Sequence, residues 1–203
     1  MDLLKSNIAV CSRARGAWRV TLRRFGASVC IACACLAASP AATRADDAPT
    51  LEYQIKASML FNFLQFVEWP PGAAGGTPTL TLGIVGDEQF GRALDVIDGE
   101  VVAGRRIVVR RMKRFDADEA APCNVLFICA SEKNRVPAIL AATTNRSVLT
   151  VGETPGFLDA GGMINFVVDD DKLRFEINRA AERQARLVIS SKLLRLASSV
   201  RGD

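Results

Sequence analysis

The sequence predicts a single α/β domain, with a mostly parallel β-sheet, crossover helices and a C-terminal antiparallel hairpin at the sheet edge. Two patterns carry this prediction. Between residues 79 and 151, short apolar runs alternate with helix-like segments, which is typical of parallel strands joined by crossover helices. After residue 162, two β-rich runs flank an acidic turn, and this order indicates a hairpin.

The domain opens with a long helix over residues 51–69. Its apolar residues follow helical spacing but extend beyond one face, so the helix either packs into the core or faces a partner protein. Pro70 and Pro71 end the helix. The Gly/Ala/Pro segment that follows, up to Pro78, is too short to separate two domains.

Four strands and two helices are expected next. The strands are expected at 79–85, 106–112, 124–130 and 147–151, and the helices at 88–97 and 134–143. Alternation along the second strand distributes arginines over both of its faces. This favours an exposed edge strand whose charged side chains hinder pairing with another chain. The C-terminal hairpin is expected to pair 163–168 with 172–177.

Two short helices complete the domain. Asn178 can cap a helix that begins at Arg179, and Ser190 or Ser191 can cap the last one. A short strand at 187–189 lies between them.

The first 45 residues differ in composition from the rest. They hold seven basic residues and one acid, then an apolar run at 25–38, then small residues up to Ala45. This order is typical of a secretory signal, and a buried helix would need a polar face that the run lacks. The run is shorter than the roughly 20 residues that span a bilayer. We expect a signal peptide at 1–45 and the domain at 46–203, although a cut after Ala41 or Ala42 also fits.

Removal of the signal changes the charge balance. The whole chain has 26 basic and 22 acidic residues, which leaves 19 basic and 21 acidic residues after residue 45 and a formal charge of −2. A near-neutral exported domain argues against nucleic-acid binding. Because no second apolar run approaches spanning length, we expect a soluble protein in an oxidising compartment.

Catalytic motifs are absent from the sequence. The chain has no histidine, which excludes Ser-His-Asp and Cys-His catalysis and imidazole metal ligands. Gly83 and Gly86 lie at the end of an expected strand, but the segment matches no nucleotide-binding motif. The acidic clusters at 116–119 and 169–171 lie in expected turns and match no calcium loop. We therefore expect no enzyme activity, no metal and no cofactor.

A glycine-rich loop over residues 152–162 is the candidate ligand site. It follows a parallel strand at its carboxyl end, where α/β domains bind ligands, although the same glycines could simply let the chain reverse into the hairpin. It contains no basic residue. The candidate ligand residues are Glu153, Gly156, Phe157, Gly161 and Asn165.

Two cysteines remain after the signal, Cys123 and Cys129. They bracket an expected strand, which puts their Cα atoms roughly 20 Å apart at about 3.3 Å per residue. A disulfide needs Cα atoms within about 7 Å. We expect these candidate redox residues not to be bonded to each other, so that each is free or one joins two chains.

Five segments together resemble the YfiR-like family of small periplasmic proteins. They are LEYQIKASMLFNFLQFVEWP, TLTLGIVGDEQFG, CNVLFICASEK, VLTVGETPGF and GGMINFVVDDDKLRFEINRAAERQARLVISSKLLRLA. The tail is the most specific part. None of these segments is a catalytic signature, so the resemblance rests on their order and spacing.

The resemblance implies a non-enzymatic regulator that binds and represses an inner-membrane diguanylate cyclase through the periplasmic sensor region of the cyclase, so lowering cyclic di-GMP. It also implies a homodimer and sensitivity to redox state. Some relatives carry a cysteine pair flanking the glycine-rich turn, where this chain has Leu158 and Asn165. Cys123 is similar to a family cysteine, but it has no evident partner, which puts redox control by an internal disulfide in doubt here.

The last hairpin and the helix after it hold the residues that we expect to contact the partner. Strand parity puts Arg174 and Glu176 on one face, opposite apolar residues that suit the core. A charged face beside an apolar one suits an interface, although a solvated sheet face would look the same. The expected contact residues are Arg174, Glu176, Arg179, Glu182 and Arg183.

Two other functions compete with the regulator. The first is a periplasmic small-molecule-binding protein that presents a ligand from the glycine-rich loop to a membrane partner. The second is a hydrolase that uses carboxylates, but the sequence lacks any recognisable paired motif for it.

Overall fold

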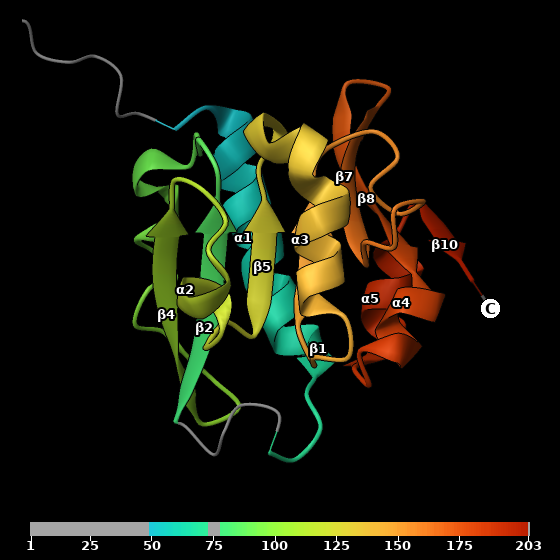
Figure 1. Ribbon diagram of the computed structural model, residues 1–203. Coiled ribbons are helices and arrows are strands. Elements are labelled where there is room, and N and C mark those ends of the chain that lie inside the picture. The colour runs from blue at the N-terminus through green and yellow to red at the C-terminus, as the bar shows by residue number, and fades with distance from the viewer. Residues whose placement is uncertain (1–48, 73–77, 203) are drawn as a thin grey trace, which may run out of the picture. The chain divides into compact units, whose positions relative to one another are not determined.

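The computed structural model describes residues 49–72 and 78–202 (Figure 1). Within them, an eight-stranded sheet has the order β10-β8-β7-β6-β5-β2-β4-β3, and a two-stranded sheet pairs β1 with β9. The expected signal at 1–45 lies outside the described residues.

The elements have the following bounds. The strands are β1 Val67–Glu68, β2 Thr79–Val85, β3 Val101–Val102, β4 Arg105–Met112, β5 Val125–Ile128, β6 Leu149–Gly152, β7 Ile164–Asp169, β8 Lys172–Asn178, β9 Val188–Ile189 and β10 Ser199–Arg201. The α-helices are α1 Leu51–Phe66, α2 Ala117–Ala120, α3 Val136–Thr143, α4 Arg179–Gln184 and α5 Ser191–Leu196, and the 3-10 helices are η1 Gly91–Leu94 and η2 Ala130–Arg135.

The main sheet is mostly parallel. The five strands β4, β2, β5, β6 and β7 pair in parallel, while β8 is antiparallel to β7 and β3 is antiparallel to β4. This confirms the predicted α/β class and the antiparallel C-terminal hairpin. The hairpin is not the outermost element, however, because β10 pairs in parallel with β8 on its free side.

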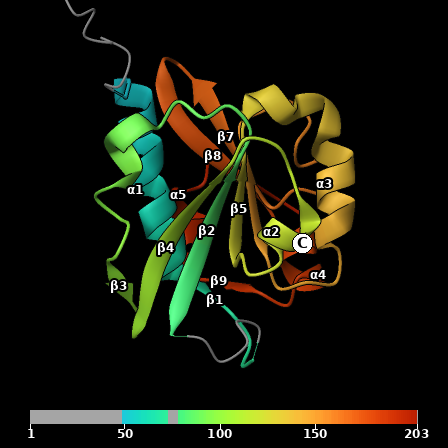
Figure 2. The ribbon, with the colours of Figure 1, turned by 60° about the vertical axis from the view of Figure 1, so that its left-hand side comes forward.

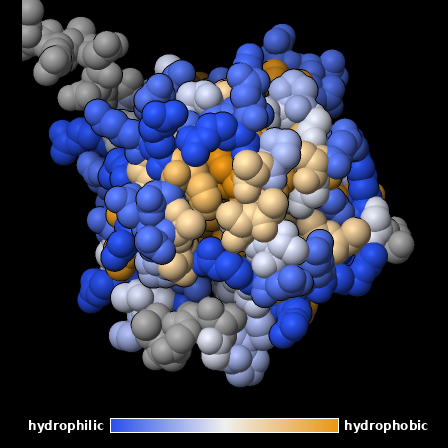
Figure 3. Space-filling model, in the orientation of Figure 1, coloured by the Kyte–Doolittle hydropathy of each residue, from blue (hydrophilic) through white to orange (hydrophobic). Residues whose placement is uncertain are grey.

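Helices cover both faces of this sheet. Figures 1 and 2 show α1 on one face and α3 on the other. The buried face of α1 joins a core that includes Phe127, Phe166 and Phe175, and α3 packs in a second cluster around Val85 and Ile128. The outer face of α3 exposes small side chains, and Figure 3 shows it as an apolar area within hydrophilic surroundings.

Helix α1 shows how tertiary pairing overrides a local pattern. Thr50 caps its start by accepting a hydrogen bond from the Tyr53 amide at 3.5 Å. The predicted helix continued to residue 69, but Val67 and Glu68 instead pair with Ile189 and Val188. The helix therefore ends at Phe66, and most of its apolar residues pack into the core.

The predicted helix at 88–97 is wrong in extent. Only Gly91–Leu94 forms a 3-10 turn, and turns follow it. Glu88 accepts a hydrogen bond from the Phe90 amide at 2.6 Å, and Gly91 has a φ of +48°. A glycine in this left-handed region, next to a local side-chain bond, starts a tight turn more readily than a regular helix.

Phe157 forms the interior of the glycine-rich loop. Its ring is 1% exposed and lies against both Gly152 and Gly162. A Cβ added at either glycine would overlap the ring. The two glycines are therefore required because the aromatic ring occupies the space where a side chain would be.

Candidate functional site

A cavity of about 350 Å³ opens where β6 ends. Its walls come from α1, from the loop after β6 and from the β7–β8 hairpin. Strand β6 pairs with β7 only through Val151 and Gly152, opposite Ile164 and Asn165. The rest of β7 therefore extends beyond β6, as Figure 1 shows for the hairpin, and the cavity lies beside this extension.

A buried ion pair forms one wall of the cavity. Lys56 Nζ lies 2.7 Å from Glu153 Oε2, and each side chain is 5% exposed. Lys56 also lies 2.5 Å from the half-exposed Glu52, one helical turn earlier, and 4.3 Å from the centre of the Tyr53 ring. The Lys56 ammonium group is therefore fully engaged by protein groups.

Glu153 gathers further donors from separate elements. Its carboxylate accepts hydrogen bonds from the Tyr53 hydroxyl at 3.2 Å and from the Ala130 amide at 2.8 Å. Burial, together with the negative charge of Glu153, raises the pKa of the Tyr53 hydroxyl, so Tyr53 remains a neutral donor at neutral pH. Glu153 thus ties α1 to the carboxyl ends of β5 and β6.

Asn165 is the one buried polar side chain at this cavity without a partner among the described residues. It is 4% exposed, and its Oδ1 is buried without a hydrogen bond. It lines the cavity and lies opposite Glu176 in the β7–β8 register. Buried polar side chains in folded proteins are nearly always paired, so an unpaired amide here points to a group that completes the site.

The structure brings three of the five candidate ligand residues to this cavity: Glu153, Gly156 and Asn165. Phe157 does not line it, because its ring lies beneath the loop. Gly161 lines a different, smaller hollow. Sequence reasoning missed Lys56 and Tyr53, although a lysine in phase with the buried positions of a largely apolar helix is a signal that could have found the first.

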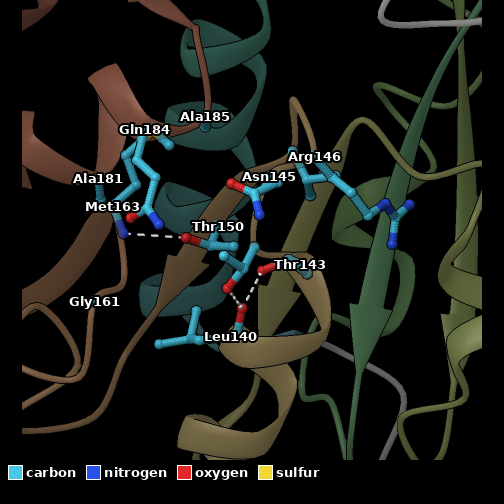
Figure 4. A pocket seen from close by; sticks show the side chains of 12 residues that line it. Leu140, Thr143, Asn145, Arg146, Thr150, Gly161, Met163, Ala181, Gln184 and Ala185 are labelled. Carbon is cyan, nitrogen blue, oxygen red and sulfur yellow. Dashed lines mark hydrogen bonds between the residues drawn. The ribbon is translucent and has the colours of Figure 1, made fainter.

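The smaller hollow, of about 40 Å³, lies between α3, β6 and α4 (Figure 4). Its threonine and arginine side chains bond to the backbone: Thr150 accepts from the Met163 amide at 3.1 Å, and Thr143 and Thr144 both donate to the Leu140 carbonyl. Arg146 donates to carbonyl oxygens near α2. The small volume of the hollow indicates a packing gap.

The expected partner residues divide into two groups. On β8, Arg174 pairs with Asp169 at 3.2 Å, and Glu176 lies 3.5 Å from Arg201. Arg183 is exposed and donates to the Gly202 carbonyl at 2.5 Å. These side chains form a mixed-charge surface over β8, β10 and α4, which we call the β8 surface.

Glu182 does not belong to the β8 surface, which corrects the expectation for this residue. It is 3% exposed, and its carboxylate accepts from the Ile189 amide at 2.7 Å and pairs with Arg179 at 3.0 Å. Leu187 and Ile189 are buried beyond α4, so the chain turns back and covers Glu182. Arg179 supports this internal bond instead of being free for a partner.

Both described cysteines, Cys123 and Cys129, are free and buried. Burial raises the pKa of each thiol; nearby carboxylates such as Glu153 raise that of Cys129 further, whereas Arg110 and Arg146 oppose the rise at Cys123. A raised pKa leaves little thiolate, the reactive form. A bond between two chains through either sulfur would require the fold to open.

Among residues 49–72 and 78–202, no cluster of acidic or cysteine side chains could hold a metal ion. In the same segments, no helix has the length and apolar character needed to cross a bilayer. The Glu153 carboxylate at the cavity serves as a hydrogen-bond and ion-pair partner of protein groups.

The chain resembles two solved structures at low sequence identity. A conserved domain protein from Vibrio cholerae has a similar structure, with a TM-score of 0.50 and 12% identity over 73% of this chain. An ABC domain from Streptococcus pneumonia, in complex with L-Trp, has a TM-score of 0.47 and 10% identity over 74% of the chain. The chain spans 60% of each of these structures.

No curated protein matches the chain. The YfiR/HmsC-like family model matches residues 53–198, which include α1, the cavity and the β8 surface. The chain belongs to the YfiR/HmsC-like family of periplasmic regulatory proteins.

Proposed function

We propose that this protein binds the periplasmic region of an inner-membrane diguanylate cyclase and holds the enzyme in an inactive state. Family membership over most of the domain carries the proposal. The protein acts without chemistry of its own, as a homodimer, after export directed by residues 1–45. It lowers cyclic di-GMP because it binds the inactive cyclase more tightly than the active one, which shifts the population toward the inactive form.

The β8 surface suits the contact with the cyclase. Arg174, Glu176 and Arg183 lie there with Arg201, whose guanidinium group is 3.5 Å from the Glu176 carboxylate. Charges of both signs on one surface favour one orientation of the partner and penalise others. Glu182 cannot contribute to this contact, because its side chain is buried.

Reversing two charges of the β8 surface should weaken repression. We expect Arg174→Glu with Arg183→Glu to reduce affinity for the cyclase by about 10- to 100-fold, equivalent to about 1.4 to 2.8 kcal/mol. Cellular cyclic di-GMP should then rise toward the level seen without the protein. Measurement of cyclic di-GMP in cells that produce each variant tests this.

The matched control reverses two charges away from this surface, with Arg92→Glu and Lys113→Glu, both exposed. It changes the net charge equally and should leave repression intact. If the β8 variant is folded, as judged by circular dichroism, and represses as well as the control, the assignment of the surface is wrong.

The cavity favours a second candidate function, a small-molecule-binding protein that presents its ligand to a membrane partner. The unpaired Asn165 amide is the observation that supports it. A permease as the membrane partner would favour this function, whereas a protein with a diguanylate cyclase domain would favour the regulator.

A further inference from the structure

We propose that the cavity beside Glu153 binds a small organic amine: a protonated amino group attached to an apolar body. The amino group would lie among the carboxylates and the Asn165 amide, and the apolar body along the hairpin. This ligand site goes beyond the proposed repression of a cyclase and does not depend on it.

The charge of the cavity selects a cation. Its lining includes the carboxylates of Glu52, Glu153 and Glu176 and a single positive group, Lys56. Arg201, outside the lining, lies 3.5 Å from Glu176 but also pairs with Asp159, so carboxylates still outnumber cations around the cavity. Lys56 is held between Glu52 and Glu153 and lies over the Tyr53 ring. A carboxylate or phosphate ligand would find no uncommitted cation in this lining, whereas an ammonium group would reduce the repulsion.

Asn165 supplies an acceptor that the protein does not use. A buried polar group without a hydrogen bond costs roughly 1–3 kcal/mol, so an N–H donor that reaches it recovers free energy on binding. The terminal torsion of an asparagine is soft, so its amide can turn toward a ligand in the cavity that it lines. An ammonium group offers up to three donors and suits both this oxygen and a nearby carboxylate.

The remaining walls favour an apolar body on the ligand. Phe166, Val168 and Leu173 line the cavity, and Val168 is 65% exposed on the extension of β7 beyond β6. The volume of about 350 Å³ lies at the small end of the range for ligand pockets, about 300–1,000 Å³. An arylalkyl or alkyl amine of modest size combines these properties.

Calorimetric titration of the purified protein tests the proposal with chemically matched probes. Phenethylamine, tryptamine and hexylamine represent the proposed class. 3-Phenylpropionate replaces the ammonium of a similar molecule with a carboxylate, and phenylalanine adds a carboxylate to phenethylamine. We expect at least one amine to bind, the matched carboxylate not to bind, and phenylalanine to bind at least tenfold more weakly than phenethylamine if that amine binds.

Asn165→Leu removes the acceptor while keeping a similar volume. We expect at least a tenfold loss of affinity for the bound amine, without loss of stability, because the variant also removes an unpaired buried group. Glu176→Gln should also weaken binding, whereas Glu119→Gln, on the exposed start of α2, should not.

Failure of all three amines to bind at millimolar concentration, equal binding of the carboxylate, or unchanged affinity in Asn165→Leu would overturn the proposal. These outcomes are separate from those for cyclase repression, since binding is measured with the protein alone.

Discussion

Replacement of Lys56 by methionine should lower the free energy of unfolding by about 3–5 kcal/mol. The variant removes the positive charge that lies 2.7 Å from the Glu153 carboxylate, whose side chain is 5% exposed. Only two neutral donors to this carboxylate remain, the Tyr53 hydroxyl and the Ala130 amide. An uncompensated buried charge costs far more than the ion pair contributes to stability. Urea denaturation of both proteins, followed by circular dichroism, measures the difference.

A second change separates the charge from the packing. Glu153→Gln combined with Lys56→Met removes both charges and keeps an acceptor for Tyr53 and Ala130, so we expect it to recover much of the lost stability. Arg92→Met, at a side chain that is 84% exposed, should change stability by no more than about 0.5 kcal/mol. If Lys56→Met is as mild as Arg92→Met, our description of the buried pair is wrong.

Phe157→Ala should cost a similar amount, about 3–5 kcal/mol. The ring is 1% exposed and fills the interior of the loop between Gly152 and Gly162. Its removal leaves a cavity that the two glycines cannot fill. Denaturation curves measure this loss, and Leu196→Ala, at a side chain that is 68% exposed, is the control with little expected change.

The fit between Phe157 and Gly162 can be tested by a pair of changes. Gly162→Ala alone should cost about 1–3 kcal/mol because the new methyl overlaps the ring. Added to Phe157→Leu, the same methyl should cost less, because the smaller side chain leaves room for it. Strictly additive losses would contradict the fit that we describe.

The local sequence pattern was sufficient to predict several of the elements. The predicted strand at 79–85 matches β2, and the hairpin prediction matches β7 and β8 to within a residue. Asn178 and Ser190 cap α4 and α5, as their side chains indicated. These elements carry their signal in consecutive residues.

Elements that depend on distant partners were missed. Residues 199–201 form β10 by pairing with the free edge of β8, and no strand was predicted there. The pairing of β1 with β9 likewise joins the end of α1 to a segment more than 100 residues later. No local pattern specifies such a contact.

In the candidate site, too, residues with a local signal were predicted and residues that depend on distant contacts were missed. The glycine-rich loop pointed to Glu153, Gly156 and Asn165 because its place after a parallel strand is a property of the local order. Lys56 reaches Glu153 across 97 residues and was missed. Strand parity correctly put Arg174 and Glu176 outside, but it could not show that the chain after α4 turns back over Glu182.

The most direct test of the account is whether the protein inhibits a cyclase that it binds. Affinity-tagged protein is purified with its partners from detergent-solubilised membranes, and cyclic di-GMP synthesis by the captured membrane protein is measured with and without added wild-type protein. We predict capture of a membrane protein with a diguanylate cyclase domain, whose activity falls when wild-type protein is added and falls much less with the Arg174→Glu, Arg183→Glu variant. Capture of a permease in place of a cyclase, or a cyclase whose activity is unchanged by saturating wild-type protein, would contradict the account.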